Sequence, residues 1–101
     1  MLTRIVKMTF KPENIPSFER IFETSRPSIE AFPGCRLVRL HRDLKAPEVY
    51  FTYSLWDSEA DLEHYRESEF FREVWGRTRA LFAQRAEAWS LEAVNPASET
   101  L

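Results

Sequence analysis

Side chains predicted to face opposite sides alternate along three stretches of the chain, a period of two that is typical of β-strands with one face in a core. These stretches run from Leu2 to Phe10, from Cys35 to Asp43 and from Ala88 to Val94. A further strand is predicted from Val49 to Trp56, because this run is rich in β-branched and aromatic residues. The tight connection at Lys45-Ala46-Pro47 predicts that the second and third strands pair as an antiparallel hairpin.

Between the first two strands, apolar residues recur at spacings of three and four, which predicts a helix from about Pro16 to Ala31. Pro27 lies inside this helix and has no backbone N–H, so the sequence predicts a kink or a break near Thr24. Phe32-Pro33-Gly34 ends the helix, because the position before a proline disfavours helical dihedrals and glycine tolerates a positive φ.

A longer helical pattern follows the third strand, from about Ser58 to Gln84. Asp57 or Ser58 is predicted to cap its first turn. Ser68 followed by Glu69 repeats the capping signal ten residues later, so we expect the helix to break and restart there. The restarted part carries one apolar stripe, made of Phe70, Phe71, Val74, Trp75, Thr78, Leu81 and Phe82.

The order β-α-β-β-α-β predicts an α+β, ferredoxin-like domain with a four-stranded antiparallel sheet. We expect one domain over residues 1–94 and a polar C-terminal tail over residues 95–101. Two helices cover only one face of such a sheet, yet both faces of the strands carry apolar groups, such as Ile5 beside Val6 and Leu37 beside Val38. An open apolar face favours a partner. We therefore predict a homodimer joined through its sheet faces.

Charge and composition exclude several classes of partner and site. The net charge of −2 gives no general attraction to nucleic acid or anionic membrane, and no apolar run of 18 residues is present, so neither partner is expected. The N-terminus shows no signal-peptide pattern, and the single Cys35 cannot form an internal disulfide, which together predict a cytoplasmic protein. With two histidines and one cysteine, a zinc site is not expected.

Five parts of the chain stand out together: Arg4 to Pro12, Phe32-Pro33-Gly34-Cys35, Leu55-Trp56-Asp57-Ser58, Tyr65 to Phe70, and Trp75. In this order they resemble the antibiotic biosynthesis monooxygenase domain, a dimeric α/β-barrel. The resemblance covers about residues 2–94 and implies the fold more strongly than an activity. The family contains cofactor-independent monooxygenases of polycyclic phenols, quinol oxidases and haem-degrading enzymes.

The haem-degrading branch carries an Asn, a Trp and an axial His at places that correspond here to about Val6, Tyr65 and Trp75. All three depart from that pattern, so haem degradation is not expected. The family also holds many members without an established reaction, so the resemblance leaves open whether the protein is an enzyme. It implies no cofactor.

The resulting hypothesis is a cofactor-independent monooxygenase that oxidises a small aromatic phenol or quinol with O2. His41 is the candidate base, since an imidazole suits deprotonation near neutral pH. Tyr53 and Tyr65 are the other candidate catalytic residues, as hydrogen-bonding partners of the substrate. The predicted substrate-binding wall consists of Phe70, Phe71 and Trp75.

Each assignment has a structural alternative. An aromatic stripe at helical spacing is ordinary core packing, and His41 or His64 can be a solvated or structural residue. The alternative function is a non-catalytic ligand-binding or stress-associated dimeric α/β-barrel protein. The sequence leaves open which sheet face meets the partner and whether His41 points into a pocket.

Overall fold

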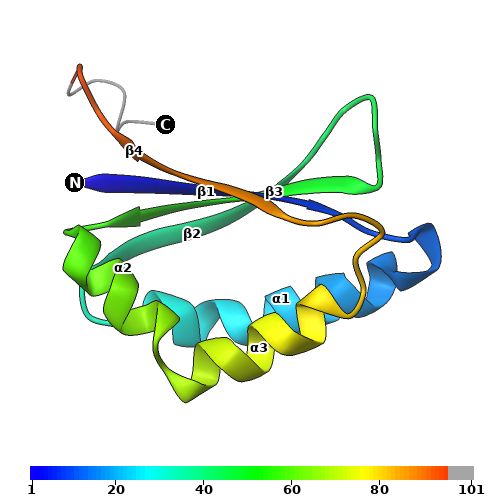
Figure 1. Cartoon of the computed structure of the whole chain (residues 1–101), viewed down its shortest axis with the longest axis horizontal. Coiled ribbons are helices and arrows are strands. Elements are labelled where there is room, and N and C mark those ends of the chain that lie inside the picture. The colour runs from blue at the N-terminus through cyan, green and yellow to red at the C-terminus, as the bar shows by residue number, and fades with distance from the viewer. Residues whose placement is uncertain (96–101) are drawn as a thin grey trace.

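The computed structural model of the chain describes residues 1–95 and confirms the ferredoxin-like α+β fold (Figure 1). The described residues form four strands and three α-helices, with one short 3-10 helix after the first strand. The elements are β1 (Leu2–Thr9), η1 (Pro12–Asn14), α1 (Ile15–Glu30), β2 (Cys35–Arg42), β3 (Val49–Trp56), α2 (Glu59–Arg66), α3 (Glu69–Arg79) and β4 (Glu87–Glu92).

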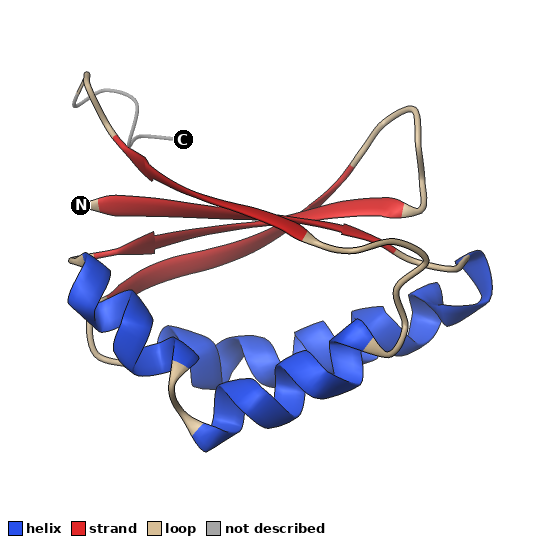
Figure 2. Cartoon of the chain, in the orientation of Figure 1, coloured by secondary structure: helices blue, strands red, loops and turns tan. Residues whose placement is uncertain are grey.

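The strands form one antiparallel sheet in the order β2-β3-β1-β4. All three α-helices lie on the same side of it, and the opposite side carries no helix within residues 1–95 (Figure 2). The register places Arg4 between Ser54 of β3 and Ser90 of β4, and its neighbour Ile5 between Tyr53 and Trp89. Because side chains alternate along a strand, these two rows face opposite sides of the sheet.

Two buried clusters join the helices to the sheet. Phe10, fully buried, stacks on Phe18 of α1 with ring centroids 4.1 Å apart and meets Tyr50 and Phe82 edge-on. At the other end Trp56 packs with Ile29, Val38 and Leu62. Its indole N–H donates to Ser54 Oγ at 3.0 Å, so the ring is buried with its polar atom satisfied.

The break between α2 and α3 follows from two serine caps, as predicted. Ser58 Oγ accepts the backbone N–H of Asp61, and Ser68 Oγ accepts that of Phe71. Gly34 has φ of 83° and packs directly against the Asp61 side chain. This contact ties the turn before β2 to the first turn of α2.

Helix boundaries differ from the prediction at two places. Of the kink or break expected near Thr24, the break is wrong, since α1 runs without interruption from Ile15 to Glu30. Pro27 lies in the last turn of this helix and cannot donate a hydrogen bond to the carbonyl of Glu23, four residues earlier. Because Glu23 is exposed, water can solvate that carbonyl, and the helix continues.

The last helix ends at Arg79 and not at Gln84, because the following segment bonds to the end of β1. Ala83 N donates to Thr9 O at 2.8 Å, and Phe82 forms a bridge with Phe10. The fourth strand ends at Glu92, two residues before the predicted limit. Most of the predicted tail, residues 96–101, lies outside the described residues.

Candidate small-molecule cavity

A cavity of about 300 Å³ lies between the helix-covered face of the sheet and the three helices. Its size is at the lower end of the roughly 300–1,000 Å³ of typical ligand pockets, which suits a small molecule. The sheet contributes residues from all four strands, among them Val6, Val38, Thr52 and Ala88. The helices α1 and α3 supply most of the remaining wall, including Phe22 and Val74.

Tyr65, Phe71 and Trp75 form an aromatic wall of this cavity. The rings of Phe71 and Trp75 are nearly parallel, with centroids 5.9 Å apart and 9° between their planes. Tyr65 meets Phe71 edge-on at 5.1 Å and stacks on Trp56 at 5.2 Å. The wall exists because Ser68 restarts the helix, which brings the end of α2 and the first two turns of α3 onto one face.

Hydroxyl groups provide the neutral polar lining, from Ser25, Thr52, Tyr65 and Thr78 among others. Thr78 Oγ1 donates to Val74 O at 2.8 Å and is satisfied within its helix. Burial raises the pKa of the Tyr65 hydroxyl, and the nearby Cys35 adds to this effect. Tyr65 is therefore a neutral phenol at physiological pH. The hydroxyl makes no side-chain hydrogen bond within residues 1–95, and the nearby Cys35 does not line the cavity.

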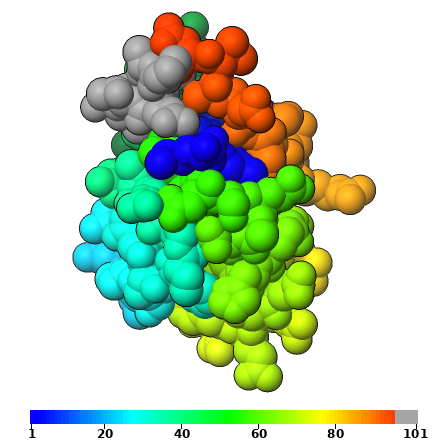
Figure 3. Space-filling model, turned by 90° about the vertical axis from the view of Figure 1, so that its left-hand side faces the viewer, coloured from blue at the N-terminus to red at the C-terminus, as the bar shows by residue number. Residues whose placement is uncertain are grey.

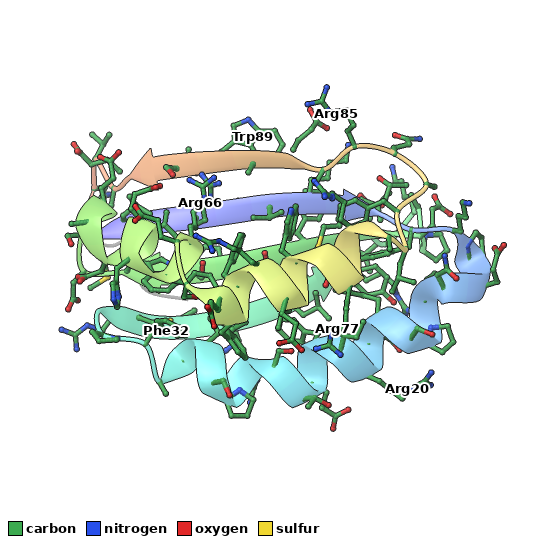
Figure 4. The ribbon with its side chains drawn as sticks, turned by 60° about the horizontal axis from the view of Figure 1, so that its bottom comes forward. Arg20, Phe32, Arg66, Arg77, Arg85 and Trp89 are labelled. Carbon is green, nitrogen blue, oxygen red and sulfur yellow. The ribbon has the colours of Figure 1, made fainter. Side chains whose placement is uncertain are left out.

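Two arginines supply the charged part of the lining. Arg4 reaches from β1 and donates to Ser90 Oγ at 2.9 Å, and Arg66 extends from the end of α2 and donates to Glu63 Oε1 at 2.7 Å. Figure 4 shows Arg66 beside β1. Burial, and then the charge of Arg66, lowers the pKa of Arg4, while Glu63 opposes that effect. The two cations therefore lie close enough to repel each other.

Arg4 and Arg66 were not among the site residues predicted from the sequence. A signal for Arg4 was present, because alternation along the first strand places it on the same face as Val6 and Met8. Both of these apolar residues line the cavity. The position of Arg66 depends on where the helix breaks and how it crosses the sheet, which spacing alone does not give.

Of the residues predicted to bind substrate, Phe71 and Trp75 line the cavity and Phe70 does not. Phe70 packs against the cluster around Trp56, with its ring 5.9 Å from that of Phe32. The ring of Phe70 thus lies on the side of α3 that faces Phe32 and the Trp56 cluster. The structure therefore does not place Phe70 at the cavity, contrary to the prediction.

Of the predicted catalytic residues, only Tyr65 lies at the cavity. His41 pairs with Phe51 and Tyr53 with Arg39, in rows that alternate with the cavity-lining Val38 and Thr52. Both therefore lie on the helix-free face, and His41 is exposed. The structure does not bring them together with Tyr65, and a catalytic role for His41 stays a prediction without support from this cavity.

The titratable residues lining the cavity are Arg4, Arg66 and Tyr65; within residues 1–95 its lining contains no His, Asp or Glu. The cavity thus carries cations and a neutral phenol, and none of these is a base near neutral pH. Over the same residues no cluster of three His, Cys, Asp or Glu side chains could hold a metal ion. No described helix is both long and apolar enough to cross a bilayer.

Together, the fold and the cavity define a small α+β domain that encloses space for a small molecule between its sheet and its helices. The model of the antibiotic biosynthesis monooxygenase family matches residues 1–75, and the chain belongs to this family. The comparison with curated proteins gave no match.

Solved structures share the fold over nearly the whole chain. A crystal structure described as antibiotic biosynthesis monooxygenase is 23% identical with a TM-score of 0.87, covering 94% of this chain and 100% of its own. A conserved protein from Methanosarcina mazei Go1 is 20% identical with a TM-score of 0.85, covering 91% of this chain and 92% of its own. The protein PA3566 from Pseudomonas aeruginosa is 24% identical with a TM-score of 0.81, covering 93% and 94%.

Proposed function

We propose that the protein binds a flat aromatic phenol or quinol in its cavity and oxidises it with O2 without a bound cofactor. The observation that carries the proposal is the parallel pair Phe71 and Trp75, which lines a cavity of about 300 Å³ together with Tyr65. Aromatic rings prefer to stack on a flat ring, and a buried hydroxyl directs a polar substituent.

The substrate itself supplies the electrons. A deprotonated phenol or related carbon acid gives one electron to O2, and the superoxide and substrate radical combine into a C–O bond. The peroxide takes up a proton and loses water, which leaves a carbonyl. For a substrate with a reactive methylene group, the methylene and one molecule of O2 become a carbonyl and one molecule of water, so no external reductant is needed. The apolar walls keep bulk water from the radical pair.

Deprotonation is the step for which the described lining offers no base. We propose that the substrate loses its proton to water and that the cationic lining stabilises the resulting anion. The rate should then rise with pH in parallel with ionisation of the substrate in use, and a more acidic substrate should have its profile shifted to lower pH.

Oxygen uptake with dihydroxynaphthalenes and anthrones, in the presence of chelator and without added flavin, tests the proposal. Trp75→Leu removes one of the parallel rings and should lower kcat/KM about tenfold, a loss equal to about 1.4 kcal/mol of ring contact. Arg77→Gln, on the same helix but outside the cavity, is the matched control. If no member of the panel is consumed, catalysis of this kind is refuted.

The absence of a base from the described lining favours one alternative, a non-catalytic protein that binds the same class of molecule. Measuring binding of a naphthol and oxygen uptake on the same protein distinguishes the binding protein from the oxygenase. Binding of a naphthol without oxygen uptake at any pH supports the binding protein, whereas uptake that tracks substrate ionisation supports the oxygenase.

We further propose that two copies pair through the helix-free faces of their sheets. The proposal is supported by the apolar side chains of that face: Trp89 is 44% and Leu91 46% exposed, and Ile5 and Tyr53 lie in the same row as Trp89. An apolar surface of this kind favours a partner, and a second copy presents a self-complementary sheet. His41 would then lie at or near the contact between the copies.

A further inference from the structure

The cavity has a charged end built from two arginines of different elements. Arg4 comes from β1 and Arg66 from the last position of α2, and both side chains line the same cavity. Figure 3 views this end of the molecule, where α2 lies against the start of β1 with β4 beside it. Two aromatic residues of the same lining are Tyr65, which precedes Arg66 in the sequence, and Trp56, on which Tyr65 stacks.

The existing partners leave much of this positive charge uncompensated. Ser90 gives Arg4 a neutral acceptor, and the one carboxylate hydrogen-bonded to Arg66 within residues 1–95 is Glu63. The set of two guanidinium groups and one carboxylate therefore carries a net positive charge. Burial, and then the charge of Arg66, lowers the pKa of Arg4, while Glu63 raises it. An anion bound at the lining that both arginines share would offset the repulsion between them.

We propose that the arginine pair formed by Arg4 and Arg66 selects ligands with a carboxylate, so that the preferred occupant is a hydroxylated aromatic acid. The aromatic part fills the apolar cavity along Phe71 and Trp75, and the carboxylate receives N–H donors from the two guanidinium groups. Arginine suits this role because its planar fork matches the two oxygens of a carboxylate. This inference rests on the proposed function, since it uses the same cavity.

The test compares two nearly isosteric probes, 3-hydroxy-2-naphthoate and 3-hydroxy-2-naphthamide, by fluorescence titration of the full chain at pH 7. The acid should bind about tenfold more tightly than the amide at low salt, as expected for charge-assisted hydrogen bonds that are partly exposed. Raising the salt concentration to about 0.5 M should reduce this preference, because solvent-exposed charge is screened.

Arg4→Gln and Arg66→Gln should each weaken binding of the acid about 5- to 10-fold and change binding of the amide less than about twofold. Arg66 is exposed at a helix end, so Arg66→Gln keeps the test valid if Arg4→Gln fails to fold. Arg77→Gln removes an arginine outside the cavity and should leave both affinities unchanged.

Equal affinity of the parent protein for the two probes overturns the inference and leaves the proposed function standing. A preference for the acid that survives Arg66→Gln and Arg4→Gln also overturns it, because the charge then comes from elsewhere. If neither probe binds, both the inference and the proposed function are refuted. Acid preference that is lost in the variants and kept in Arg77→Gln supports the arginine pair.

Discussion

Ser25 offers a way to test the cavity by filling it. It lies on α1, is 4% exposed and lines the cavity, so a larger side chain at this position enters empty space. Fully burying a leucine side chain contributes about 1.5–3 kcal/mol, and fixing its rotamer costs about 0.5–1 kcal/mol. Ser25→Leu should therefore raise the free energy of unfolding by about 1–2 kcal/mol.

The same substitution should remove ligand binding, since the added carbons occupy the space between α1 and the aromatic wall. Stability and binding then change in opposite directions, as expected where a void is kept for function. Ser28→Leu, on the exposed side of the same helix, is the matched control. It gains only a few tenths of a kcal/mol of helix propensity and should leave binding unchanged.

Urea denaturation and thermal melting measure the first effect, with about 4–8 °C of Tm expected for each kcal/mol in a domain of this size. Fluorescence titration with a naphthol measures the second. If Ser25→Leu is less stable than the parent, the site has no room for the side chain. If it binds the naphthol as tightly as the parent, the ligand does not occupy this cavity.

Four further predictions concern single positions. Gly34→Ala should cost at least about 1–2 kcal/mol in urea denaturation, because φ is 83° and the new methyl group meets Asp61. Ile5→Glu should halve the mass measured by light scattering if the helix-free faces pair. Burial raises the pKa of the Cys35 thiol from 9.0 to about 11, so alkylation at pH 8 should be slow and stability should fall as pH rises from 9 to 11. His41→Ala should leave oxygen uptake within about twofold, since a base must lie within hydrogen-bonding reach of the substrate.

Each of these has a contrary outcome. Unchanged stability of Gly34→Ala would mean that the turn accommodates a side chain. A parent protein that is already monomeric would remove the basis for Ile5→Glu. Rapid alkylation of Cys35 would show that the thiol is accessible and ionised. A loss of about 100-fold or more in His41→Ala would restore the histidine as the base and place the reaction on the other face of the sheet.

The fold was predictable because its signals are local. Alternation indicated three strands and β-propensity the fourth, Val49–Trp56. The capping signals at Asp57 or Ser58 and at Ser68 predicted two helix starts, which the structure confirms with Ser58 and Ser68 as the caps. The errors come from tertiary contacts. The hydrogen bond from Ala83 to Thr9 accompanies the end of α3 before the predicted residue. Local propensities do not predict a hydrogen bond between segments so far apart in the chain.

The candidate site was predictable only in part, for a related reason. Helical spacing identified Phe71 and Trp75 as one wall, but it also included Phe70, which the helix rotates into the core. Alternation on the strands gives two faces and does not say which one the helices cover. The choice of His41 as a base rested on that missing information.

The sheet separates the candidate base His41 from the aromatic residues proposed to bind the substrate. His41 lies on one face and the aromatic wall on the other, so the backbone of β2 and β3 stands between an imidazole and any ligand of the cavity. Direct proton transfer requires a heavy-atom distance of roughly 2.6–3.2 Å, or one bridging water. A substrate in the cavity must therefore be acidic enough to ionise by itself, and Arg4 and Arg66 supply positive charge where that ionisation would be stabilised. Under the proposed function, the acidity of a candidate molecule is thus the property that should decide whether the protein oxidises it.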